Sequence, residues 1–265
     1  MATFSVEFFS TSLHRFTTFK AVLPNDMPME MVGANPHYQR PMKTLILLHG
    51  YSGSENDWLM NTIISEKAGM YNLAVIFPRG DNSFYLDGPE TGRNYCTYIG
   101  EELPQYVSKV FGLSGQREDT FIGGFSMGGF GALHTAFAFP ERFAKVLSFS
   151  SALVQHNMET MTPETDDGIA NYDYYRMVFG PLEELPHSAN NPEYLLEQLQ
   201  LKKLPIPKIF MCIGTEDFLY ELNQIFRSFL AEHKVDFQYQ DGPGAHDFQT
   251  VSSFLEYGLK FLVEG

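Results

Sequence analysis

Five glycines surround a single serine in the stretch Gly123–Gly131, which reads GGFSMGGFG and directly follows the apolar run Thr120–Ile122. Glycine weakens helices and strands alike, so a chain gathers it only where the backbone needs unusual torsions or close packing. A strand that turns abruptly into a helix needs both, and it holds one hydroxyl out at the bend. The alternative is a glycine-rich structural turn. Because an apolar run precedes the stretch and a helical pattern follows it, the spacing Gly124-x-Ser126-x-Gly128 favours a nucleophilic serine.

A serine hydroxyl needs partners to act as a nucleophile, and after such a turn they follow in the order acid, then histidine. Asp217 comes just past the apolar run Lys208–Ile213, and His246 lies in a loop of glycine and proline after the next strand-like run. We predict that His246 takes the proton from Ser126, while Asp217 fixes the tautomer of the imidazole and stabilises the imidazolium. Glu216 competes with Asp217 for this role, and the simpler interpretation of Asp217 is a helix N-cap.

Two backbone N–H groups are also expected beside the serine, because an attacked ester develops negative charge on its carbonyl oxygen. Met127 offers one of them at the start of the predicted helix. The turn after the strand-like run Thr44–Leu48 offers the other, and we assign it to Tyr51. His49 is expected to hold this turn by hydrogen bonds rather than to act as a second base. These features together predict acyl transfer through an acyl-serine intermediate that water resolves.

The rest of the chain alternates short apolar runs with helical patterns. The strand-like runs are Thr44–Leu48, Leu73–Phe77, Thr120–Ile122, Val146–Phe149, Lys208–Ile213 and Asp236–Tyr239. The helical patterns are Tyr95–Phe111, Gly128–Phe139, Glu221–His233 and Phe248–Leu262. This alternation predicts an α/β fold whose mostly parallel sheet has helices on both faces and all strand carboxyl ends at one edge. The segment Phe4–Leu23 precedes it and reads as two antiparallel strands joined near residues 12–14.

One interval, residues 151–205, has no strand-like run and is too long for a plain connection. We interpret it as an insertion over the site, within a single domain that spans residues 1–265. Helices are expected near Tyr172–Val178 and Pro192–Leu199. Its rings and methionine either line the site or form a subunit contact, and they are Tyr172, Tyr174, Tyr175, Met177 and Phe179.

Composition narrows the possible partners. The 265 residues carry a formal net charge of −14, so nucleic acid and anionic membrane surfaces would be repelled and a small neutral substrate is favoured. No cluster of histidine and aspartate has the spacing of a metal site, so no metal is expected. Cys96 and Cys212 are too few for a disulfide framework. The start MATFSVEFFS lacks the pattern of a signal peptide, which predicts a cytoplasmic location.

Most of the chain resembles the esterase D branch of the α/β-hydrolases, and within it the small tributyrin and acetyl esterases. The similar tracts are LLHGYSG (47–53), FPRGDNSFYLDG (77–88), YIGEELPQYV (98–107), FIGGFSMGGFGAL (121–133), GTEDFLY (214–220) and GAHDF (244–248). By this resemblance Ser126, Asp217 and His246 match the family's catalytic triad. Tyr51 and Met127 match its oxyanion-hole donors.

The resemblance implies a serine carboxylesterase with an α/β-hydrolase fold, acting without a cofactor on short acyl esters, acetyl to butyryl, including acetylated sugars or phenolic esters. It also implies a homo-oligomer, a dimer or tetramer. Phe248 stands where many relatives have tryptophan, which bears on the acyl or alcohol pocket rather than on the triad. A small acyl chamber is our hypothesis, because Phe125 and Met127 flank the serine.

Two other functions compete with this interpretation. An S-formylglutathione hydrolase would need basic residues for its anionic substrate, and Arg79, Arg93 and Arg176 are candidates. A catalytically silent binding protein on the same fold would usually lack the serine, the histidine or the tight turn. Acyl transfer of the mycolyltransferase kind fits less well, because those enzymes work outside the cell.

Overall fold

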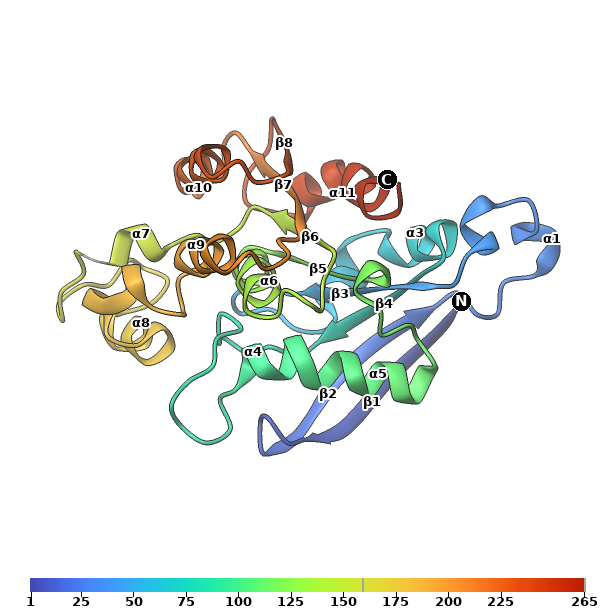
Figure 1. The fold of residues 1–265 in the computed structure, drawn as a ribbon, viewed down its shortest axis with the longest axis horizontal. Coiled ribbons are helices and arrows are strands. Elements are labelled where there is room, and N and C mark those ends of the chain that lie inside the picture. The colour runs from blue at the N-terminus through green and yellow to red at the C-terminus, as the bar shows by residue number, and fades with distance from the viewer. Residues whose placement is uncertain (159, 265) are drawn as a thin grey trace.

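The computed structural model describes residues 1–158 and 160–264, and it is built on one eight-stranded sheet (Figure 1). The strand order is β1-β2-β4-β3-β5-β6-β7-β8. The strands are β1 (Ala2–Ser10), β2 (Arg15–Leu23), β3 (Lys43–Leu48), β4 (Leu73–Pro78), β5 (Thr120–Phe125), β6 (Lys145–Phe149), β7 (Lys208–Gly214) and β8 (Phe237–Gly242). Neighbours from β4 to β8 pair in parallel, whereas β1 pairs antiparallel with β2 and β2 with β4. The predicted α/β fold, with its N-terminal hairpin, is confirmed.

The central strands form because their side chains are apolar on both faces. Every residue of β4, β5 and β6 is buried, as expected for parallel strands covered by helices on each side. Within β3 the side chains divide between two cores: Leu45 and Leu47 pack on one side of the sheet, and Ile46 and Leu48 on the other.

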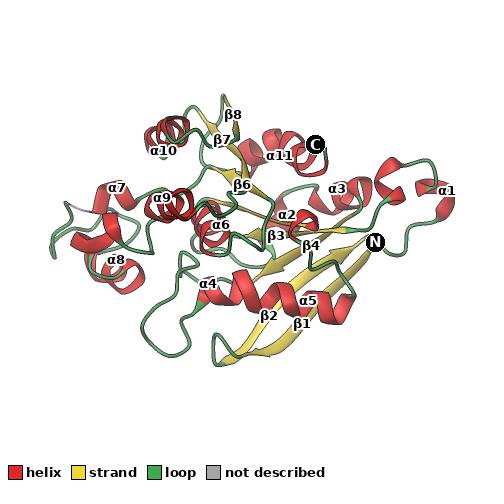
Figure 2. Ribbon diagram, in the orientation of Figure 1, coloured by secondary structure: helices red, strands yellow, loops and turns green. Residues whose placement is uncertain are grey.

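Helices cover both faces of the sheet (Figure 2). They are α1 (Met29–Val32), α2 (Asp57–Asn61), α3 (Ile64–Tyr71), α4 (Tyr95–Thr97), α5 (Leu103–Phe111), α6 (Met127–Ala138), α7 (Gln155–Met158), α8 (Tyr172–Phe179), α9 (Pro192–Lys202), α10 (Tyr220–Glu232) and α11 (Phe248–Val263). The core that contains Leu45 also takes Trp58 of α2, Ala68 of α3 and Leu259 of α11. The larger core takes residues of α5, α6 and α8 to α10. None of the described helices has both the length and the apolar character that crossing a membrane requires.

The helix predicted over Tyr95–Phe111 is interrupted. A π-helical turn at Tyr98–Glu102 separates α4 from α5. It places the carboxylate of Glu102 at the tip of the N-terminal hairpin, where it accepts hydrogen bonds from Ser10 Oγ (2.6 Å), Thr11 N (2.6 Å) and Ser12 N (3.2 Å). The tract EELPQYV therefore joins the antiparallel edge of the sheet to its helical cover.

Residues 151–205 contain no strand in their described part. They form α7, α8 and α9, and the two helices predicted here are confirmed. Helix α9 packs on α6, while α8 lies farther from the sheet at the edge of the molecule (Figure 1). This segment thus contacts α6, the helix that follows Ser126.

Candidate active site

Ser126 lies between β5 and α6 in a strained backbone conformation, with φ 58° and ψ −121°. Its N–H donates to the carbonyl oxygen of Phe149 at 3.0 Å, and its carbonyl oxygen accepts from the N–H of Ala152 at 3.0 Å. These bonds from the end of β6 hold a conformation that a non-glycine residue rarely adopts. Strain of this kind is typical of a residue whose side chain must project from a sharp bend.

The glycines two positions before and after Ser126 are required by packing. A Cβ atom on Gly124 would overlap the carbonyl group of Gly128, and a Cβ on Gly128 would lie 2.5 Å from the carbonyl oxygen of Leu48. Both obstacles are backbone atoms, which cannot rotate away. The GGFSMGGFG stretch is therefore the tight strand-to-helix turn that its spacing predicts.

The side chains of Ser126, His246 and Asp217 form a continuous hydrogen-bonded chain. His246 Nε2 lies 2.9 Å from Ser126 Oγ, and His246 Nδ1 lies 2.8 Å from Asp217 Oδ2. The Asp217 side chain is fully buried, whereas 17% of the His246 side chain is exposed. This arrangement allows Nδ1–H to donate to the carboxylate while Nε2 accepts from the serine hydroxyl.

Loops at the carboxyl ends of β7 and β8 hold the acid and the histidine. Asp217 Oδ1 accepts a 2.9 Å hydrogen bond from the N–H of Leu219, which orients the carboxylate toward His246. The imidazole stacks on the ring of Phe125 with centroids 4.6 Å apart. Glu216, the competing acid, instead accepts a hydrogen bond from the N–H of Gly244 and so ties the two loops together.

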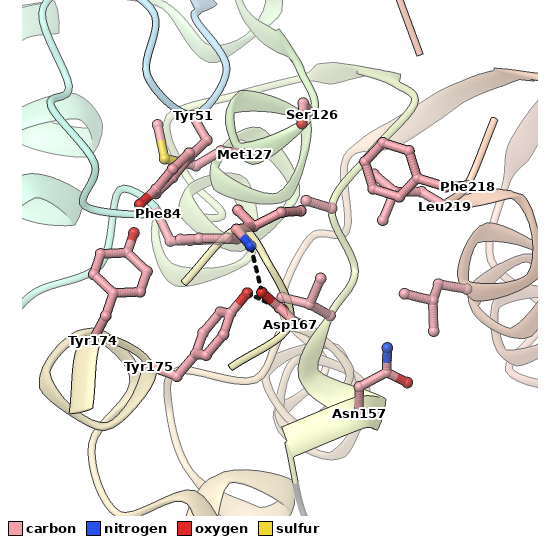
Figure 3. A pocket seen from close by; sticks show the side chains of 14 residues that line it. Tyr51, Phe84, Ser126, Met127, Asn157, Asp167, Tyr174, Tyr175, Phe218 and Leu219 are labelled. Atoms are coloured by element: carbon pink, nitrogen blue, oxygen red, sulfur yellow. Dashed lines mark hydrogen bonds between the residues drawn. The ribbon is translucent and has the colours of Figure 1, made fainter. Parts of the chain in front are cut away.

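The two predicted oxyanion donors lie beside the serine. Met127 is the first residue of α6, where backbone N–H groups have no partner within the helix. Tyr51 and Met127 line the same pocket as Ser126 (Figure 3). The turn that carries Tyr51 lies close to Ser126. A Cβ atom built on the neighbouring Gly50 would be 3.4 Å from Ser126 Cβ.

His49 has a structural role, as expected. Its Nε2 accepts a 2.9 Å hydrogen bond from the N–H of Gly80, and its Nδ1 lies 2.8 Å from the carbonyl oxygen of Gly50. Burial lowers the pKa of this imidazole, so the neutral tautomer is favoured. His49 thus joins the Tyr51 turn to the loop after β4.

The pocket at Ser126 has a volume of about 220 Å³. Apolar side chains dominate its wall near the serine, and Asp167 and Asn157 lie at the far end (Figure 3). Its lining residues are Tyr51, Phe84, Ser126, Met127, Ala152, Val154, Asn157, Asp167, Ile169, Tyr174, Tyr175, Phe218, Leu219 and Leu222. Sequence reasoning missed Asp167, Asn157 and Phe218 as pocket residues, since no motif marks them.

Some of the residues that the sequence analysis placed near the site line the pocket, and others do not. Tyr174 and Tyr175 line it, whereas Phe179 is buried in the core behind α8. Phe125 and Phe248 are outside the lining; they contact each other, with ring centroids 5.0 Å apart. The prediction that Phe125 narrows an acyl chamber is therefore wrong, because this side chain points to the opposite face of the sheet from Met127.

His134 and Cys96 lie close together away from the Ser126 pocket. His134 is buried in α6 between the carbonyl oxygen of Ala189, 2.8 Å from its Nε2, and the sulfur of Cys96, 3.5 Å from its Nδ1. Burial raises the pKa of Cys96 and lowers that of His134 to about 4, so both are neutral. Within the described residues, no three His, Cys, Asp or Glu side chains are grouped to hold a metal ion.

A parallel sheet with a hydrogen-bonded serine, histidine and aspartate at its carboxyl edge defines an α/β-hydrolase. Residues 10–250 match the family model described as "Putative esterase". The chain is 36% identical to an acetyl esterase of Caldicellulosiruptor saccharolyticus over 99% of its own length and 98% of that protein's. The chain belongs to this esterase family and is an enzyme that hydrolyses carboxylic esters.

Two solved structures from Staphylococcus aureus share the whole architecture. One is the substrate-bound fluorophosphonate-binding serine hydrolase F, with a TM-score of 0.84, 30% identity and coverage of 100% of this chain and 99% of that one. The other is an S-formylglutathione hydrolase, with a TM-score of 0.82, 31% identity and 99% of each chain covered.

Proposed function

We propose that the protein is a serine carboxylesterase that hydrolyses small neutral esters of short acyl groups, acetyl to butyryl, including acetylated sugars or phenolic esters. The observation that carries this is the Ser126–His246–Asp217 chain of 2.9 and 2.8 Å hydrogen bonds at the wall of a largely apolar pocket. The acetyl esterase named above supports the acyl class.

In the proposed reaction, His246 Nε2 accepts the hydroxyl proton as Ser126 Oγ attacks the carbonyl carbon of the ester. The N–H groups of Met127 and Tyr51 stabilise the negative oxygen of the tetrahedral intermediate. His246 then gives its proton to the departing alcohol, which leaves an acyl-serine. A water molecule, activated by the same imidazole, releases the acid and restores the hydroxyl. Asp217 holds the imidazole and stabilises its charged form throughout.

The acyl-length preference follows from the space around the serine. Met127, Ala152 and Leu219 line the pocket together with Ser126. The cavity of about 220 Å³ must hold the alcohol part of the ester as well as its acyl chain. We therefore infer that chains beyond butyryl fit poorly.

S-formylglutathione hydrolysis is the second candidate, supported by the S. aureus structure of that name. Glutathione is anionic, and none of the residues that line the Ser126 pocket is a lysine or arginine. Arg79, Arg93 and Arg176, proposed from the sequence, are all outside the lining. The pocket therefore favours an uncharged ester over this thioester.

The test is hydrolysis of 4-nitrophenyl acetate, butyrate and octanoate beside S-formylglutathione, by the natural protein and by Ser126→Ala. We expect fast turnover of acetate and butyrate that falls by about 10⁴-fold or more in the variant. A dominant thioester activity would instead support the second candidate. Turnover that survives in Ser126→Ala would contradict the mechanism. The dimer or tetramer and the cytoplasmic location stay predictions.

A further inference from the structure

The far end of the Ser126 pocket carries a single, firmly held carboxylate. Asp167 Oδ1 accepts hydrogen bonds from the N–H groups of Ile169 and Ala170, both 2.9 Å long, and Oδ2 accepts one from the Tyr175 hydroxyl at 2.7 Å. Asp167 lines the same pocket as Ser126, and Figure 3 shows its carboxylate directed at the Tyr175 hydroxyl. A carboxylate has about four acceptor positions, so one remains for a ligand.

This carboxylate is charged, and no cation in the lining balances it. Burial raises the pKa of Asp167, but the hydrogen bonds from Ala170, Tyr175 and Ile169 outweigh it, and the pKa lies below its usual range. The lining contains no lysine, arginine or histidine. Arg93 lies outside the lining and forms a 3.7 Å ion pair with Glu90. Its charge opposes the rise that burial causes in the pKa of Tyr174.

Three aromatic rings in the lining form a row that ends at Tyr175, whose hydroxyl bonds to the carboxylate. The rings of Tyr51 and Tyr174 meet edge to face with centroids 5.6 Å apart, and those of Tyr174 and Tyr175 lie 5.5 Å apart. The Tyr174 hydroxyl donates to the carbonyl oxygen of Asn82 at 2.8 Å, so this ring is fixed before a ligand arrives. A cation within about 6 Å of a ring centroid is attracted to the face of the ring.

We propose that Asp167 and the three tyrosine rings make the alcohol side of the pocket select by charge. Alcohols that carry an ammonium group bind in preference to neutral alcohols of the same shape, and anionic alcohols or thiols are rejected. This inference rests on the proposed esterase function, and it extends the substrate class from neutral to cationic esters. The chain's net charge of −14 acts in the same direction.

Acetylthiocholine and 3,3-dimethylbutyl thioacetate test the inference, because they share the acyl group and nearly the same shape but differ by one positive charge. At an ionic strength of about 0.15 M, distant charges are screened beyond roughly 8 Å. We expect kcat/KM to favour the cation about five-fold, the size of one contact between unit charges in water. Asp167→Asn should bring this ratio close to one, because kcat/KM falls further for the cationic thioester than for the neutral one.

Asp173→Asn is the matched control, because it removes the same charge from exposed α8 outside the pocket lining. It should leave the ratio as in the natural protein. A ratio of one or below in the natural protein, or a ratio that survives Asp167→Asn, would overturn the inference.

A second measurement does not depend on thioester turnover. It compares how strongly choline and 3,3-dimethylbutan-1-ol inhibit the hydrolysis of 4-nitrophenyl acetate. Choline should inhibit at lower concentration, and only Asp167→Asn should remove the difference. Ester turnover without this discrimination contradicts the charge selection alone. Choline binding in calorimetry by a protein that hydrolyses no ester would contradict the proposed function alone.

Discussion

The side-chain amide of Asn223 donates a 2.8 Å hydrogen bond to the carbonyl oxygen of Ser151, and so joins α10 to the loop behind Ser126. The same amide donates to the carbonyl oxygen of Leu219 at 2.9 Å, two residues after Asp217. Asn223 is only 1% exposed. One buried side chain thus links the loop that carries Asp217 to the loop that supports Ser126.

Replacing Asn223 by leucine should lower both stability and activity. The substitution keeps a similar shape but removes one of two hydrogen bonds from each carbonyl group. Ser151 then keeps only the N–H of Leu153, and Leu219 keeps only the backbone N–H of residue 223. Each lost bond costs about 1 kcal/mol. We expect a lower urea midpoint and a lower kcat with KM little changed, because the triad geometry loosens while the pocket wall stays. Unfolding at the same midpoint as the natural protein would show that these bonds contribute little.

Asp217→Asn should lower kcat by about 10⁴-fold without unfolding the protein. The amide oxygen can keep the bond to Leu219 N–H, which turns the amide N–H₂ toward His246 Nδ1 and places the imidazole proton on the nitrogen that faces Ser126. The control is Asp241→Asn, an acid at the end of β8 that bonds to Tyr220 and Tyr239. Equal kcat for the two variants would exclude the proposed role of Asp217.

Gly128→Ala tests the packing of the turn at Ser126. Its Cβ atom would meet the carbonyl oxygens of Leu48 and His49 at 2.5 and 2.6 Å, so backbone must move. We expect a loss of about 1–3 kcal/mol in the free energy of unfolding and a large fall in kcat. Gly115→Ala is the control, since its Cβ would contact only Ser108 Oγ at 3.7 Å; its unfolding should change by less than about 0.5 kcal/mol.

Glu102→Gln should destabilise the protein in a pH-dependent way. Burial raises the pKa of Glu102, but hydrogen bonds from Ser10, Thr11 and Ser12 outweigh it, so the folded-state pKa is depressed. A depressed pKa stabilises the folded state above the unfolded pKa of about 4.3, and this is lost as the pH falls through the folded pKa.

We expect Glu102→Gln to cost about 1 kcal/mol at pH 7, because the carboxylate is partly exposed, and less at pH 3. Urea unfolding at both pH values measures this. Glu101→Gln is the control, because Glu101 bonds only weakly to Gln105 at 3.4 Å. A constant difference between the natural protein and Glu102→Gln at both pH values would mean that the charge is not involved.

Strands and site positions could be predicted from the sequence where local chemistry decides them. The apolar run before Ser126 and the position of Asp217 and His246 after later runs follow from the rule that parallel strands end at one edge. The π-helical turn and the contact of Glu102 with the hairpin could not be predicted, because they depend on where two distant segments meet. Asp167 could not be predicted as a pocket residue either, because in the sequence it is one acid in a polar loop and its position in the pocket depends on distant segments.

Ser126 and His246 are 120 positions apart, and the histidine follows the last strand of the sheet. A chain that stops before β8 would contain the sharp turn and its serine but would lack His246, the proposed base. Under the proposed mechanism, ester turnover requires the loop after β8, and thus the pairing of β8 with β7. Recovery of ester turnover during refolding would therefore report on this pairing.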